Sequence, residues 1–148
     1  MNLSLALPAL LAIPLVGIVL IALGTRPKAT ALWTSMLNLI PGFLASGVVL
    51  RSGELLFGPD PIPAREIFPA KFILGMDGLS LSMVWLTLVV TLTAMGSARE
   101  GIKREKEYYI CLLLIGVGAL GAFLSVDLFY FFTFHEVALI PTFLLVGM

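Results

Sequence analysis

The chain alternates between long apolar stretches and short polar links. Five apolar stretches cover residues 3–23, 29–50, 78–98, 108–126 and 127–148. A helix that crosses a bilayer needs about 20 mostly apolar residues, because lipid offers no hydrogen-bond partner to an irregular backbone. Apolar residues occupy every face of these stretches, so their length and flanking charges carry the assignment, not an amphipathic period. The pattern predicts an all-α integral membrane protein of about five transmembrane helices, forming one membrane domain over residues 1–148.

The links between the stretches differ in length and chemistry. The longest covers residues 51–77 and holds four prolines between positions 59 and 69, which predicts an extended surface loop without helix. Residues 99–107 alternate in charge, as is typical of a solvated helix–helix connection. Asp77 and Asp127 directly precede the third and fifth stretches, and we expect each to be the N-cap of its helix.

Composition supports a membrane protein and excludes other classes. Of 148 residues, 59% are hydrophobic and 12% charged, with nine basic and nine acidic side chains. Soluble domains carry roughly 25% charged residues, so a soluble globular domain is excluded. The zero net charge excludes a nucleic-acid-binding protein, and the apolar content excludes disorder. The single Cys111 excludes a disulfide framework and predicts a packed or lipid-facing thiol, and the single His135 excludes a multi-histidine metal site.

Basic residues indicate how the chain is oriented. Six lie in the links after the first and third stretches, against three in the link over residues 51–77. Because basic residues favour the cytoplasmic side, we expect the N-terminus outside and the six-charge links inside. The first stretch has no basic residue before it, unlike a secretory signal, so we expect a retained span.

One motif in the fourth stretch matches the sequence pattern of a nucleotide-binding site. Residues 116–121 (GVGALG) match the G-x-G-x-x-G pattern of dinucleotide-binding folds, which requires a preceding strand and a helix that opens at the glycines. Here the glycines lie in the middle of an apolar span. We interpret them as small residues that let helices approach closely, and Gly42 and Ser46 in the second stretch in the same way.

Glu136 is the most informative residue. It lies about nine residues from either likely boundary of the fifth stretch, hence near the middle of the bilayer at about 1.5 Å per residue. A charge there costs on the order of 2.5–3.5 kcal/mol, and desolvation favours the neutral form unless a cation lies nearby. A carboxyl that changes charge with its neighbours suits a proton relay. The alternative is a neutral glutamate that hydrogen-bonds a neighbouring helix.

Two neighbours of Glu136 are further candidates. His135 points about 100° away on the helix, so it shares no face with Glu136 but can share a water or partner helix; a structural role is the alternative to a tuning role. Pro141 removes a helical N–H, frees the carbonyl of Val137 and predicts a kink where water can enter. A kink that only sets the helix shape is the alternative.

Two segments resemble a known family. Residues 74–80 (LGMDGLS) and 131–141 (FFTFHEVALIP) are similar to the N-terminal part of chain M of proton-translocating NADH-quinone oxidoreductase, which is subunit 4 of the mitochondrial enzyme. Sodium/proton antiporter subunits of the Mrp type are relatives of this family. Glu136 and Pro141 match the family's glutamate and its following proline, whereas His135 stands where the family usually has an aromatic residue.

The resemblance implies a membrane-arm subunit that moves protons, with Glu136 coupled to lysines in later spans. It implies NADH, flavin, iron–sulfur clusters and quinone in other subunits, and none of these cofactors in this chain. The partners it implies are the other membrane subunits, the lipid bilayer and protons, with no nucleic acid, in the plasma membrane of a bacterium. Because family members have more than a dozen spans, we interpret the chain as an N-terminal fragment that is inactive alone.

Two other functions stay open. One is a subunit of a monovalent-cation/proton antiporter built from the same helices. The other is a non-catalytic membrane protein that supports assembly, in which Glu136 serves packing alone.

Overall fold

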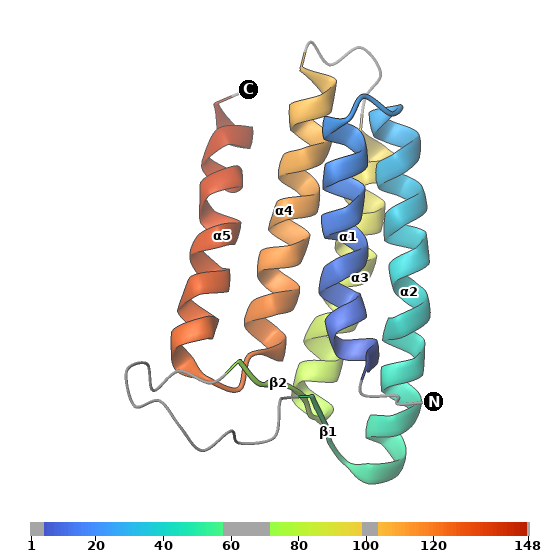
Figure 1. Ribbon diagram of the computed structural model, residues 1–148, viewed down its shortest axis with the longest axis vertical. Helices are drawn as coiled ribbons and strands as arrows, with labels where there is room; N and C mark the ends of the chain where they lie inside the picture. The colour runs from blue at the N-terminus through green and yellow to red at the C-terminus, as the bar shows by residue number, and fades with distance from the viewer. Residues whose placement is uncertain (1–4, 58–71, 99–103, 148) are drawn as a thin grey trace.

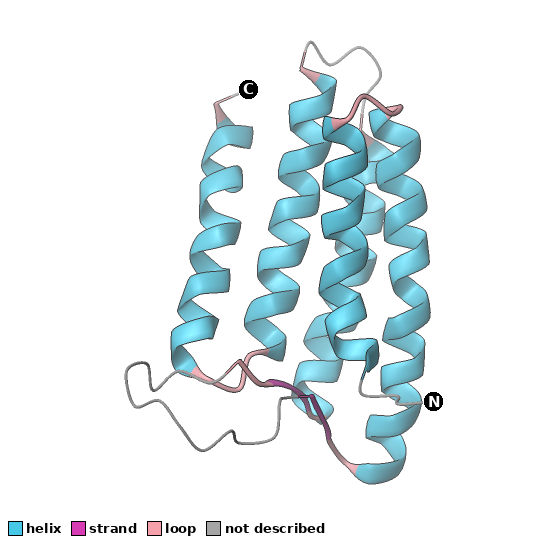
Figure 2. Ribbon diagram, in the orientation of Figure 1, coloured by secondary structure: helices cyan, strands magenta, loops and turns pink. Residues whose placement is uncertain are grey.

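The computed structural model describes residues 5–57, 72–98 and 104–147, which form five α-helices and one small sheet (Figures 1 and 2). The helices are α1 (Ala6–Ala22), α2 (Pro27–Ser52), α3 (Gly78–Ser97), α4 (Glu105–Leu124) and α5 (Leu128–Val146). All five run along the long axis of the molecule. Four of them, α2 to α5, are long and apolar enough to cross a membrane, and α1 is a shorter apolar helix of 17 residues. The predicted all-α membrane fold is confirmed.

The region between α2 and α3 differs in detail from the predicted loop. α2 begins with Pro27, whose fixed φ suits a first helical turn. It ends at Ser52 and is capped by Gly53, whose φ of 87° is the left-handed geometry of a helix C-terminus. Strands β1 (Leu55–Phe57) and β2 (Leu74–Met76) then pair antiparallel, with Leu55 opposite Met76. The four prolines predicted to keep this link extended lie outside the described residues.

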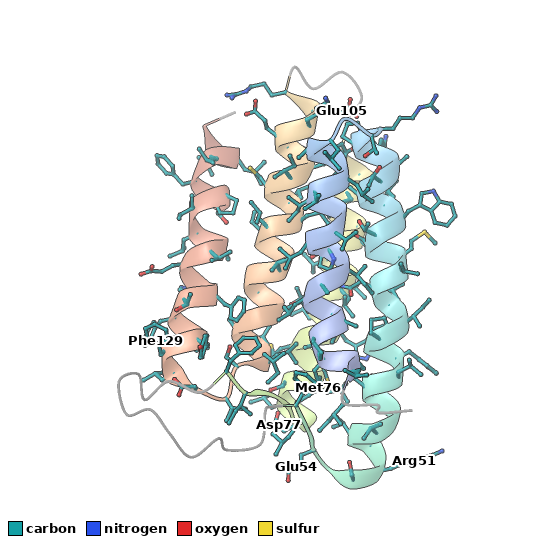
Figure 3. The ribbon with its side chains drawn as sticks, viewed as in Figure 1. Arg51, Glu54, Met76, Asp77, Glu105 and Phe129 are labelled. Atoms are coloured by element: carbon teal, nitrogen blue, oxygen red, sulfur yellow. The ribbon has the colours of Figure 1, made fainter. Side chains whose placement is uncertain are left out.

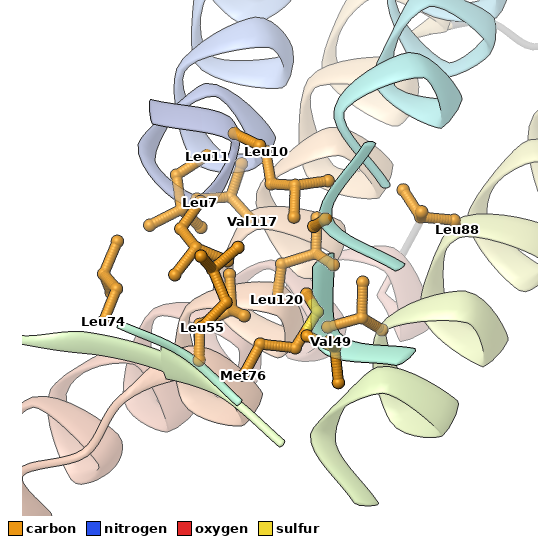
Figure 4. Packing of buried hydrophobic residues seen from close by; sticks show 14 residues of the cluster. Leu7, Leu10, Leu11, Val49, Leu55, Leu74, Met76, Leu88, Val117 and Leu120 are labelled. Carbon is orange, nitrogen blue, oxygen red and sulfur yellow. The ribbon is translucent and has the colours of Figure 1, made fainter. Parts of the chain in front are cut away.

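α4 is the central helix of the bundle. It packs against α1, α2, α3 and α5, and 56% of its most apolar 18-residue window is buried, whereas the same share is 6% for α5. One apolar cluster fills the end of the bundle next to the sheet and joins Leu7, Leu74, Met76 and Leu120 (Figure 4). A second cluster lies toward the opposite end. α5 therefore stands at the side of the bundle, against α4 (Figure 1).

The two faces of α2 show which solvent surrounds the bundle. Its buried face consists mostly of small or polar residues: Ala31, Thr34, Ser35, Asn38, Gly42, Ala45 and Ser46. Its exposed face carries large apolar residues, among them Trp33, Ile40 and Phe43. This is the reverse of a helix on a soluble protein, and it is typical of helices that pack through small residues and face lipid.

Glycines make the close helix contacts that were predicted. A Cβ atom at Gly118 of α4 would lie 2.7 Å from the backbone nitrogen of Ala138 in α5, and one at Gly121 would overlap the ring of Phe134. A Cβ at Gly42 of α2 would lie 2.8 Å from Leu88 Cδ1 in α3. The interpretation of residues 116–121 as a packing motif is confirmed, because only a residue without a side chain fits so close to the neighbouring helix.

Apart from Glu136, the charged side chains of the described residues gather at the two ends of the bundle. Arg51, Glu54 and Asp77 lie at the end that carries the sheet, and Glu105 lies at the opposite end (Figure 3). Near Glu105, Arg104 forms an ion pair with Glu107 in the first turn of α4, so part of the predicted solvated link is helical. The buried thiol of Cys111 confirms the packed alternative. The predicted orientation across the membrane stays a prediction.

Candidate functional site

The turn between α4 and α5 fixes where α5 begins. Asp127 caps α5 as predicted, because its Oδ1 accepts a hydrogen bond of 2.8 Å from the backbone N–H of Phe129. The backbone N–H of Val126 donates to the carbonyl of Ile73 at 3.2 Å, which ties the turn to β2. A Cβ atom at Gly75 would lie 2.7 Å from Val126 Cγ2, so the absence of a side chain at this glycine lets the turn pack closely against β2. Residues 73–75, which include the first two residues of the segment 74–80, thereby position the start of α5.

One face of α5 packs on α4. Phe134 and Ala138 lie against Gly121 and Gly118, and Pro141 is the one buried residue of the helix within the described part of the chain. The opposite face carries exposed large side chains, including Phe132, Leu139 and Ile140. The rotation of α5 is therefore set by contacts that leave most of its circumference uncovered by the described part of this chain.

Glu136 lies on the uncovered face at mid-helix. It is the ninth of the 19 residues of α5, and its side chain is exposed. Within the described residues the carboxylate has no hydrogen-bond or ion-pair partner. Exposed apolar residues flank it one turn away on either side, Phe132 before it and Ile140 after it. The geometry thus presents one carboxyl at the middle of the helix, on an exposed surface that is mostly apolar and also carries Thr133 and His135.

His135 and Pro141 take different positions from Glu136. The imidazole of His135 stacks on the ring of Phe131 one turn earlier, with ring centroids 6.2 Å apart and planes 5° apart. No described hydrogen bond joins it to Glu136. Pro141 faces α4, and α5 continues helically through it to Val146. The Thr142 hydroxyl donates to the carbonyl of Ala138 at 2.7 Å beside the proline. The structure therefore places the three predicted residues on one helix without bringing their side chains together.

Asn38 is a buried polar residue that the sequence reasoning missed. Its side chain is 3% exposed, and its Nδ2 donates 3.1 Å to the carbonyl of Leu10 in α1. Leu10 is four residues before Pro14, so its carbonyl is the one that lacks a helical N–H donor. An amide in the middle of an apolar span was the available signal, because such a group requires a partner in lipid.

Comparison with known proteins gives the following similar proteins. The chain is 32% identical to NADH-quinone oxidoreductase subunit M of Pseudomonas aeruginosa over 155 residues, covering 96% of this chain and 30% of that protein. It is 30% identical to NADH-ubiquinone oxidoreductase chain 4 of Mycosarcoma maydis, covering 95% of this chain and 31% of that protein. For subunit M of Rhodobacter capsulatus the identity is 33%, over 84% of this chain and 25% of that protein. No family model matches the chain.

These relatives confirm the resemblance that residues 74–80 and 131–141 indicate. Proteins named subunit M or chain 4 cover most of this chain at 30–40% identity. The chain spans less than a third of the length of these relatives.

Proposed function

We propose that this homologue of NADH-quinone oxidoreductase subunit M is part of a proton-translocating membrane-arm subunit, and that Glu136 is its proton-relay group. The observation that carries the proposal is the position of Glu136: a single carboxyl at the centre of an apolar helix, on the face this chain leaves uncovered. A carboxyl placed where ionisation is costly is retained for a function by default, since a neutral residue would stabilise the helix better.

The uncovered position also defines what else the relay requires. A charged carboxylate that faces lipid is costly, so release of the proton needs a cation or water brought to it by another segment. No Lys or Arg lies within the described span residues beside Glu136. In the proposal, a basic residue outside these spans contacts Glu136 and alternates with it in charge. NADH oxidation and the redox groups belong to other subunits, which drive this alternation.

His135 and Pro141 are supporting residues in the proposal. The imidazole of His135 stacks on Phe131 and has no bond to the carboxyl, so in the proposal it tunes the local field and does not relay the proton. Pro141 leaves the carbonyl of Val137 without a helical donor, one residue after Glu136, and this carbonyl offers an acceptor to water that reaches the carboxyl.

The decisive experiment replaces the carboxyl by an amide of the same shape. In the assembled complex reconstituted in vesicles, Glu136→Gln should abolish most proton uptake per NADH oxidised, measured with a pH-sensitive dye. The matched control is Glu54→Gln, which removes an exposed carboxylate at the end of the bundle and should leave the ratio unchanged.

Other results would select the other functions. Unchanged proton uptake in a fully assembled Glu136→Gln complex contradicts the proposal. A variant that fails to assemble while its remaining complexes pump normally assigns Glu136 to packing. Cation/proton exchange in vesicles without any NADH oxidation assigns the chain to an antiporter.

A further inference from the structure

A small cavity with three polar side chains in a mainly apolar lining lies between α1, α2, α3 and α4, away from Glu136. Its volume is about 10 Å³, and its lining includes Pro14, Ser35, Asn38, Thr91 and Gly116. A space open to a water-sized sphere of roughly 10–15 Å³ holds one water molecule, provided that two to four polar groups surround it. The volume therefore allows at most one water molecule in the cavity.

Asn38 supplies a buried oxygen that requires a hydrogen-bond donor in the cavity. Its amide orientation is fixed, because the carbonyl of Leu10 can only accept and so must face the Nδ2 donor. The other end of the amide, Oδ1, is buried and has no hydrogen-bond partner within the described residues. A buried unpaired acceptor costs about 1–3 kcal/mol, and more where no water is near.

Two hydroxyls complete the lining. The Ser35 hydroxyl donates to the Met95 sulfur at 2.9 Å, which leaves its oxygen lone pairs able to accept. Thr91 of α3 lies opposite Gly116 of α4: a Cβ atom built on Gly116 would be 3.3 Å from the Oγ1 atom of Thr91. Two acceptors and one hydroxyl that can donate match the hydrogen-bonding capacity of a single water molecule.

We infer that this cavity is a binding site for one ordered water molecule, which donates to Asn38 Oδ1 and to Ser35 and accepts from Thr91. The Asn38 side chain then bridges the carbonyl that Pro14 frees in α1 and a water shared with α3. In this arrangement the Leu10 carbonyl is paired with Asn38 Nδ2, and Asn38 Oδ1 is paired with the water, so no polar group of the two is left unpaired in the middle of the membrane.

The test is a map of the membrane-embedded protein, in its assembly, at a resolution that shows ordered water. The wild-type map should show a peak within hydrogen-bond distance of Asn38 Oδ1. The peak should be lost in Gly116→Ala, whose added methyl group lies against Thr91 between two lining residues, and in Thr91→Val, which keeps the shape but removes the hydroxyl. The matched control is Gly47→Ala, because a Cβ there meets nothing within 4 Å.

A second measurement keeps the inference falsifiable if a variant changes the map elsewhere. Gly116→Ala should lower the thermal unfolding temperature relative to Gly47→Ala, although both exchange a helical glycine for the better helix former. A wild-type map that shows other buried waters but an empty cavity overturns the inference. So does a side chain that fills the cavity, a peak that persists in Gly116→Ala, or equal unfolding temperatures for the two glycine variants.

Discussion

Asp77 shows how one carboxylate defines a helix start. Its Oδ1 accepts a hydrogen bond of 2.7 Å from the backbone N–H of Ser80, and this bond holds the pKa of the Asp77 carboxyl below its ordinary value. Because the folded pKa is lowered, the stabilisation is present above the unfolded pKa of about 3.9 and is lost as the pH falls through the folded pKa.

We therefore predict a pH-dependent effect of Asp77→Ala. At neutral pH the variant should unfold at a lower temperature than the wild type, and this difference should shrink as the pH falls below about 4, where the wild-type carboxyl protonates. Asp77→Asn, which keeps an acceptor and loses the charge, should lie between the two. Unfolding temperatures across this pH range test it; a difference that stays constant with pH would show that the charge contributes nothing.

The caps and Asn38 show which residues a sequence reveals. Asp77 and Asp127 were predictable because a cap bonds backbone two or three residues away, so its partner is known from the sequence. The partner of Asn38 lies 28 residues away, on another helix. Nothing local indicates which helix will lie beside it. The position of Glu136 in the middle of its helix was predictable in the same local way, but the face on which it lies depends on how α5 is rotated against α4.

At the scale of elements, the α4–α5 contact rests on backbone proximity. We predict that Gly118→Ala destabilises the protein by about 1–3 kcal/mol, as overpacking does, because the added Cβ would meet backbone, which cannot move aside as a flexible side chain can. The free energy of unfolding in detergent or nanodiscs measures this. Gly47→Ala is the control and should be neutral or slightly stabilising, since its Cβ enters open space. Equal effects of the two changes would contradict the proximity.

The helices were predictable and the small sheet was not, for a physical reason. Helix positions follow from the length of apolar stretches, which lipid enforces. β1 and β2 are three residues each, and 16 residues separate Phe57 from Leu74. Such short strands gain stability from their neighbours: Leu74 and Met76 are buried in the apolar cluster and Leu74 also bridges Ser125. That gain depends on the tertiary fold, which a local pattern does not contain.

At the scale of the whole molecule, burial is uneven. α4 is enclosed by four helices, whereas α5 presents its Glu136 face to the surroundings. The proposed function requires another segment or subunit to cover this face and bring a cation to the carboxyl. An isolated chain in lipid would instead leave the face in contact with acyl chains, which pack about as well against a small side chain as against a large one.

The stability of two matched truncations distinguishes these situations. Leu113 in α4 is 1% exposed, and Ile140, one turn from Glu136, is 66% exposed. In the 148-residue chain alone, Leu113→Ala should cost about 2–5 kcal/mol because it opens a cavity, whereas Ile140→Ala should cost close to nothing. In the assembled complex, Ile140→Ala should become costly as well, since a covering partner turns the site into a packed interior. The free energy of unfolding measures the effect in the chain alone, and the stability of the complex against dissociation measures it in the assembly. If Ile140→Ala is neutral in both, the face meets lipid in the assembly too, and Glu136 has no partner there to exchange its proton with.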